Sequence, residues 1–118
     1  MTELRFLDRL SAGDRAVLEE RFVVRDYARG EIVISHLDED REVFFVLEGR
    51  LRATLYSSHG HEVSYRDIGT GDVVGELAAI DGAPRSATVE ALEQARVGRL
   101  SAETFRELVK TQIGRAQV

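Results

Sequence analysis

A short stretch near the middle of the chain carries the residue types of an anion-binding pocket. Residues 75–88 have the sequence Gly-Glu-Leu-Ala-Ala-Ile-Asp-Gly-Ala-Pro-Arg-Ser-Ala-Thr. Arg85 offers a planar fork of donors that matches a phosphate, and Ser86 and Thr88 add hydroxyl donors. Glu76 would be repelled by a phosphate unless it accepted hydrogen bonds from a neutral group, such as a sugar hydroxyl. Anion donors beside one acceptor predict a pocket for a sugar phosphate.

The backbone of the same stretch offers further donors. Gly75 allows a close approach that a side chain would obstruct. Residues Glu76 to Ile80 can wind one helical turn, whose first N–H groups have no partner within the helix and point at an anion. The stretch therefore predicts backbone as well as side-chain contacts to the phosphate.

This segment resembles the phosphate-binding cassette of cyclic nucleotide-binding domains. That cassette runs Gly-Glu-Leu-Ala, a short spacer, then Pro-Arg-(Ala/Ser/Thr)-Ala-Thr, and the chain carries both halves at the family's spacing. The resemblance implies that Glu76 takes the ribose 2′-hydroxyl and that Arg85 takes the cyclic phosphate, helped by Ser86 and by backbone amides. The implied ligand-binding residues are Gly75, Glu76, Leu77, Ala78, Pro84, Arg85, Ser86, Ala87 and Thr88.

The implied function is that of a regulatory module for a 3′,5′-cyclic nucleotide, with no catalytic residues, no cofactor and no metal. We expect cAMP in preference to cGMP: a hydroxyl after the arginine helps bind guanine in relatives that bear threonine there, but serine, as in Ser86, occurs in cAMP binders too. We expect the turn through Leu77 and Ile80 to move against a C-terminal helix when ligand enters. The responding partner would be an effector domain in the same chain or a separate protein.

Three departures from the family's pattern are present, and two of them, the missing Gly-Asp turn and the short C-terminal helix, motivate an alternative. Leu37-Asp38 stands where the family usually has a Gly-Asp turn, and Val74 stands where it usually has an aromatic residue. The expected helix after Ser101 ends close to Val118, so the longer helix that often covers the base is short or missing and no base-covering residue is named. The alternative is a cyclic-nucleotide-like fold that has lost its ligand and serves as a protein-interaction domain.

Length and composition predict one domain spanning residues 1–118. The formal charge of −5 disfavours direct nucleic-acid binding, which needs clustered positive charge. There is no cysteine, the start lacks a basic leader followed by an apolar run, and no window approaches eighteen apolar residues. We therefore expect a cytoplasmic location without membrane contact.

Hydrophobic periodicity predicts a mainly β fold, an antiparallel β-roll (jelly-roll-like) flanked by N-terminal and C-terminal helices. Ser11 followed by Asp14 predicts a capped helix over Ala12 to Phe22. A second helix is expected over Ser101 to Ile113, with Ser101 as its cap. Strands are expected at Val23 to Tyr27, Ile32 to Ser35, Val43 to Leu47, Arg50 to Tyr56, Glu62 to Ile68, Ala87 to Leu92 and Ala95 to Leu100. The run from Val43 is apolar on both faces, as in a doubly buried strand.

Rival sites are poorly supported by the sequence. His59 and His61 would share one strand face, but the positions where a metal enzyme of the cupin type would carry its glutamate are Tyr65 and Arg66, so no metal site is expected. Gly69, Gly71 and Gly75 do not have the spacing of a dinucleotide-binding loop. Ser86 has no nearby histidine, which gives no support for Ser-His hydrolysis.

Overall fold

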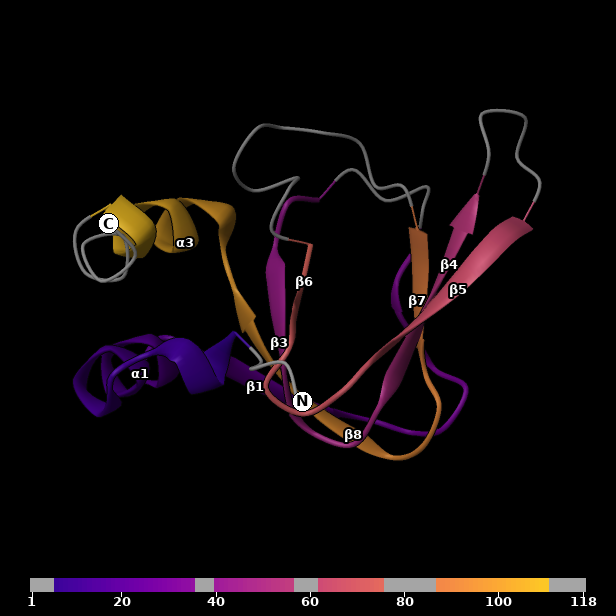
Figure 1. The fold of residues 1–118 in the computed structure, drawn as a ribbon, viewed down its shortest axis with the longest axis horizontal. Coiled ribbons are helices and arrows are strands. Elements are labelled where there is room, and N and C mark those ends of the chain that lie inside the picture. Colours follow the sequence, from indigo (N-terminus) through magenta and orange to yellow (C-terminus); the bar gives the residue numbers. More distant parts are fainter. Residues whose placement is uncertain (1–5, 36–39, 57–61, 76–86, 111–118) are drawn as a thin grey trace.

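A computed structural model describes residues 6–35, 40–56, 62–75 and 87–110 of the chain. In this part of the chain two four-stranded sheets face each other, and the helices lie together on one side of them (Figure 1). The strands are β1 (Val23–Tyr27), β2 (Ile32–Ile34), β3 (Val43–Glu48), β4 (Leu51–Tyr56), β5 (Glu62–Ile68), β6 (Val73–Val74), β7 (Ala87–Ala91) and β8 (Ala95–Leu100). The helices are the 3-10 helix η1 (Leu7–Arg9) and the α-helices α1 (Ala12–Glu19) and α3 (Ala102–Leu108).

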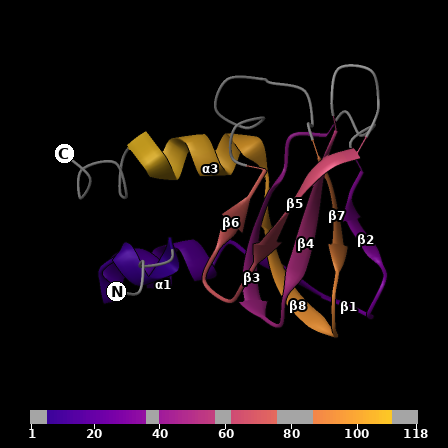
Figure 2. The same ribbon diagram turned by 45° about the vertical axis from the view of Figure 1, so that its right-hand side comes forward.

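Every described strand pairing is antiparallel. The first sheet has the order β1-β8-β3-β6 and the second the order β2-β7-β4-β5. Most consecutive strands, such as β3 and β4, therefore belong to different sheets, whereas β4 and β5 form a hairpin within the second sheet, and the chain passes back and forth between the two layers (Figure 2). The predicted β-roll with flanking helices is confirmed.

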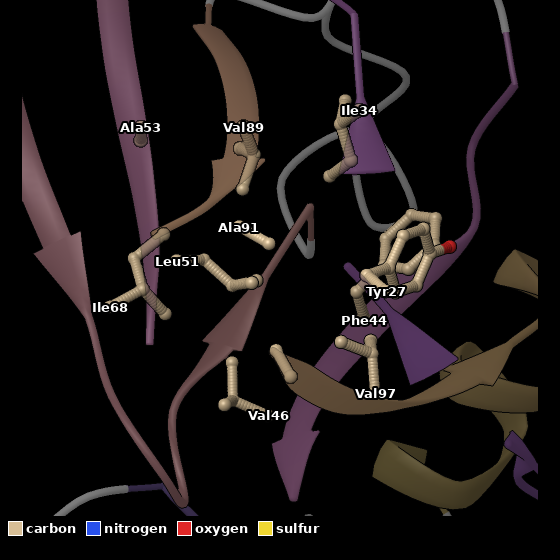
Figure 3. Packing of buried hydrophobic residues seen from close by; sticks show 11 residues of the cluster. Tyr27, Ile34, Phe44, Val46, Leu51, Ala53, Ile68, Val89, Ala91 and Val97 are labelled. Atoms are coloured by element: carbon tan, nitrogen blue, oxygen red, sulfur yellow. The ribbon is translucent and has the colours of Figure 1, made fainter. Parts of the chain in front are cut away.

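Strand β3 is buried on both faces, as its unbroken apolar run predicted. Phe44 and Val46 point into a cluster between the two sheets, here called the inter-sheet core (Figure 3). Val43 and Phe45 point the other way, into a helix-side core. The inter-sheet core consists of Tyr27, Ile34, Phe44, Val46, Leu51, Ala53, Ile68, Val89, Ala91, Ala95 and Val97. The helix-side core consists of Leu7, Leu18, Val43, Phe45, Leu100, Phe105 and Leu108.

Helix α1 begins where the sequence predicted and ends earlier. The Ser11 side chain accepts a hydrogen bond from the backbone N–H of Asp14 at 3.1 Å, which is the expected cap. The prediction that the helix reaches Phe22 is wrong, because the last regular residue is Glu19. The N–H of Phe22 bonds the carbonyl of Glu19, a tighter turn that leads into β1. Phe22 continued the apolar periodicity because its ring still packs against the helix-side core.

Helix α3 is also capped as predicted. The Ser101 side chain accepts a hydrogen bond from the backbone N–H of Thr104 at 3.1 Å, and Phe105 and Leu108 are buried in the helix-side core. The regular α-helix ends at Leu108, and the part of the predicted helix beyond residue 110 lies outside the described residues. Neither α-helix of the described chain has the length and apolar character needed to cross a membrane.

Candidate functional site

The structure describes the two ends of the predicted cassette. Gly75, at one end, and Ala87 and Thr88, at the other, lie in the described part of the chain. Residues 76–86 lie outside it, and they include Glu76, Leu77, Ala78, Pro84, Arg85 and Ser86. The ligand contacts assigned to these side chains therefore stay predictions, and the local structure can be built only from the strands that hold the two ends.

Gly75 directly follows β6, the strand that leads into the cassette. Val73 and Val74 pair with Phe45 and Phe44 of β3, which fixes the strand at the edge of the first sheet. The φ angle of Gly75 is 91°, in the left-handed region that residues with a Cβ rarely adopt. A glycine is therefore needed at this point of the backbone.

The other end of the cassette leads into β7, between β2 and β4 of the second sheet. Ala87 lies opposite Leu55 and packs against the inter-sheet core, whereas Thr88 lies opposite Thr54 on the other face of the sheet. Thr54 itself is buried. The first two residues of β7 thus point in opposite directions: Ala87 toward the space between the sheets and Thr88 away from it.

Residues 76–86 connect one sheet to the other. Strand β6 ends at Val74 in the first sheet, and β7 begins at Ala87 in the second. The end of β6 and the start of β7 point to the same end of the roll (Figures 1 and 2). A ligand held by this connection would therefore lie at that end of the roll, where both sheets can contribute side chains.

The inner face of the second sheet becomes more polar and more exposed toward this end. Strand pairing places three rows of side chains across β5, β4 and β7 on the face that carries the inter-sheet core. The first row consists of Ile68, Leu51 and Ala91, the second of Arg66, Ala53 and Val89, and the third of Ser64, Leu55 and Ala87. All of the first row is buried, whereas Arg66 and Ser64 are exposed and Leu55 and Ala87 are half-buried.

Arg66 is the residue of this face that the sequence analysis missed. It appeared there only as a position that failed to supply a metal ligand. The signal that could have identified it is its spacing of two from Ile68, since alternate residues of a strand share a face. An arginine in register with Ala53 and Val89 breaks the apolar pattern of the inner face.

The outer face of the same sheet carries an ion pair. The Nε of Arg52 donates to Oδ1 of Asp67 at 2.8 Å, and its guanidinium lies 5.3 Å from the centre of the Tyr65 ring. The hydrogen bond from Arg52 lowers the pKa of Asp67 and raises the pKa of the arginine. Because both side chains are partly exposed and lie on the face turned away from the inter-sheet core, this pair is a surface feature of the β4–β5 hairpin.

The described residues contain no group of three or more histidine, cysteine or acidic side chains able to hold a metal ion. His59 and His61 lie outside these residues, so the expectation that they bind no metal stays a prediction.

Comparison with known proteins supports the resemblance noted for the cassette. The sequence profile of the cyclic nucleotide-binding domain matches residues 24–112. A cAMP-dependent protein kinase regulatory subunit from Mycosarcoma maydis is 34% identical over 113 residues, which cover 96% of this chain and 21% of the fungal protein. The chain thus spans about a fifth of that relative.

Solved structures share the fold. The regulatory domain of Toxoplasma gondii PKA in its co-crystal structure with cAMP aligns with a TM-score of 0.76 and 27% identity, covering 90% of this chain and 41% of that one. The EAL enzyme Bd1971, solved in cAMP-bound and cGMP-bound forms, aligns with a TM-score of 0.66 and 29% identity, covering 75% of this chain and 24% of that one. With the profile match, the β-roll and the described ends of the cassette, these likenesses establish that this chain belongs to the cyclic nucleotide-binding domain family.

Proposed function

We propose that residues 1–118 form one regulatory domain that binds a 3′,5′-cyclic nucleotide through residues 75–88, with cAMP preferred over cGMP. The observation that carries the proposal is the placement of the two cassette ends. Gly75, at a φ of 91°, and Ala87, facing the inter-sheet core, bring the connection between the sheets to one end of the roll. One relative is named a cAMP-dependent protein kinase regulatory subunit, and one solved structure is a regulatory domain in complex with cAMP, which supports the same ligand class here.

Arg85 would neutralise the phosphate charge, and backbone amides near Leu77, Ala78 and Ala87 would complete its shell. Glu76 would accept the ribose 2′-hydroxyl. Neither role needs a cofactor or a covalent step, so the proposed domain binds its ligand without catalysing a reaction. Its expected location is the cytoplasm.

The choice of base rests on Ser86. A serine after the cassette arginine is compatible with cAMP, whereas threonine at that position helps bind guanine in relatives. The likeness to a protein solved with either nucleotide supports testing both.

Calorimetric titration of the purified chain with cAMP and with cGMP tests this function directly. Arg85→Ala should weaken cAMP binding by at least about tenfold, because losing a charged partner in a mostly buried site costs on the order of 2–5 kcal/mol. Arg29→Ala, at an exposed turn before β2, is the matched control and should bind as the parent does. If a folded sample shows no heat of binding with either nucleotide, the interaction-domain alternative is favoured instead.

We further propose that binding is relayed to α3 and from there to an effector domain or partner protein. The support is the packing of β6: Val74 contacts the inter-sheet core, and Val73 contacts the helix-side core that contains Phe105 and Leu108 of α3. A shift of the cassette would displace β6 and thereby change the packing of both cores. Amide hydrogen exchange in α3 should therefore change when cAMP is added, and identical protection with and without ligand would contradict the relay.

A further inference from the structure

A pocket of about 460 Å³ lies where β8 runs into α3, here called the α3 pocket (Figure 1). Its lining includes Arg21 from the connection between α1 and β1, Arg41 and Glu42 from the segment before β3, Arg99 at the end of β8 and Thr104 in α3. None of its lining residues belongs to the predicted cassette, residues 75–88. The pocket also includes the first residue of β1, the edge strand opposite β6, and these two edges are three strand spacings apart, about 14 Å. The α3 pocket is therefore separate from the strand that leads into the cassette.

The lining of this pocket is positively charged although the chain carries a formal charge of −5. Arg99 pairs with Glu42, with 2.6 Å between Nε and Oε2. Arg21 and Arg41 form no ion pair within the described part of the chain, whereas arginines elsewhere on the strands, such as Arg52, pair with a carboxylate. With three arginines and one glutamate, the lining carries a net charge of +2. Two exposed guanidinium groups are thus available to an anion.

The donors of the pocket suit a phosphoryl group better than a carboxylate. Each free guanidinium offers five N–H donors in a planar fork, which matches the oxygens of a phosphate. The Thr104 hydroxyl accepts a hydrogen bond from Ser101 at 2.9 Å, so its own hydrogen can be donated to a ligand. A phosphoryl group presents three acceptor oxygens and a charge near −2, which matches the lining, whereas a carboxylate has two oxygens and a charge of −1.

We propose that the α3 pocket binds a phosphoryl group, with Arg21 and Arg41 as its charged donors and Thr104 as its hydroxyl donor. The group would be free phosphate or the phosphate of a small organic ester. Bound there, it would link α3 to the segments that precede β1 and β3, which are far apart in the sequence. This site does not depend on the proposed function, since no lining residue lies in the cassette.

Heteronuclear NMR titration of the full chain at pH 8 tests the site, because the amide signals of α3 report on the pocket. The four proteins are the parent, Arg21→Gln, Arg41→Gln and Arg29→Gln. Arg29 lies in an exposed turn beyond the other end of β1, so its variant removes the same charge away from the pocket and is the matched control. Each protein is titrated with inorganic phosphate, glycerol 3-phosphate and succinate, after circular dichroism has shown that it is folded.

At least one of the two phosphates should bind the parent saturably and shift the amide signals of α3. Arg21→Gln and Arg41→Gln should each raise the Kd about five- to thirtyfold, and Arg29→Gln should leave it unchanged. Tighter binding of glycerol 3-phosphate than of inorganic phosphate would identify an organic ester as the source of the group, and equal or weaker binding would identify free phosphate.

Four results would overturn the site. The first is that neither phosphate binds saturably. The second is an equal loss in Arg29→Gln, which would show attraction by the charge of the whole chain only. The third is succinate binding as tightly as phosphate, which would indicate a site for acidic side chains of a partner protein. The fourth is loss of these shifts in Arg85→Ala, which would place the phosphate in the cassette. Failure of the parent to bind cyclic nucleotide would contradict the proposed function and leave the result at the α3 pocket standing.

Discussion

Gly49 lies directly against Gln94 in the turn between β7 and β8. A Cβ built on Gly49 would come within 2.6 Å of the carbonyl oxygen of Gln94, and the φ angle of Gly49 is 89°. The β3–β4 turn and the β7–β8 turn therefore meet backbone to backbone at the end of the roll away from the cassette, and glycine is the residue that permits the contact.

Gly49→Ala is expected to destabilise the fold by about 2–5 kcal/mol. A left-handed backbone costs an L-residue about 1–2 kcal/mol, and forcing a carbon into a filled space costs about 1–3 kcal/mol more. Gly30→Ala is the matched control, because Gly30 has a φ of 86° and no atom within 4 Å of the added Cβ. Urea denaturation should show the larger loss for Gly49→Ala. Equal losses in the two variants would mean that the contact with Gln94 contributes nothing.

Seven of the eight strands were predictable along the chain because strand patterns depend on neighbouring residues, whereas the two-residue strand β6 (Val73–Val74) was not predicted. The unbroken run from Val43 predicted burial on both faces, and the structure confirms it with two separate cores. The end of α1 was not predictable, since Phe22 keeps the helical spacing of apolar residues while its backbone already turns toward β1. Periodicity reports which side chains face a core, and here it does not report where the helical hydrogen bonds stop.

The backbone at the start of the cassette was predictable because the motif is contiguous in sequence: the glycine expected at position 75 has a φ angle of 91°, a conformation that favours glycine. The ligand contacts assigned to residues 75–88 stay predictions. Arg66 was missed, although its spacing of two from Ile68 indicates that the two residues share a face of the strand. The pairing of Arg66 with Ala53, and through Ala53 with Val89, shows that this face is the inner one.

Ser101→Ala should weaken the fold by about 1 kcal/mol, because the N–H of Thr104 would lose the side-chain acceptor that caps α3. Ser101→Asp keeps an acceptor at the same position and places a negative charge at the helix start, so it should be neutral or stabilising. Urea denaturation measures both. A loss of stability in Ser101→Asp equal to that in Ser101→Ala would contradict the capping role.

Asp67→Asn should change how stability depends on pH. Arg52 lowers the pKa of Asp67 in the folded chain from an ordinary value of 3.8, so the ionised form favours folding. This contribution is fully present above the unfolded-state pKa and is lost as the pH falls through the lower folded-state pKa. The thermal midpoint of the parent should exceed that of Asp67→Asn by a small, constant amount above about pH 5, and the gap should close toward about pH 2. A gap that stays constant throughout this range would contradict the assigned ion pair.

Phe45→Ala should be among the most destabilising single substitutions, at about 3–5 kcal/mol. Phe45 is fully buried at the centre of β3, and its ring centre lies 5.8 Å from that of Phe6, 5.0 Å from that of Phe22 and 6.2 Å from that of Phe105. It therefore joins the N-terminal segment, the connection between α1 and β1, and α3 to the sheet. Removing the ring leaves a cavity that these three segments share.

Phe45→Leu separates loss of volume from loss of the ring, since it keeps much of the apolar side chain. It should cost less than Phe45→Ala, and urea denaturation followed by circular dichroism measures both. If the helix-side core depends on this ring, amide exchange in α3 should rise more than exchange in β4 and β7, whose residues pack in the inter-sheet core on the other side of β3. A uniform rise across all of these elements would show instead that the two cores unfold as one unit.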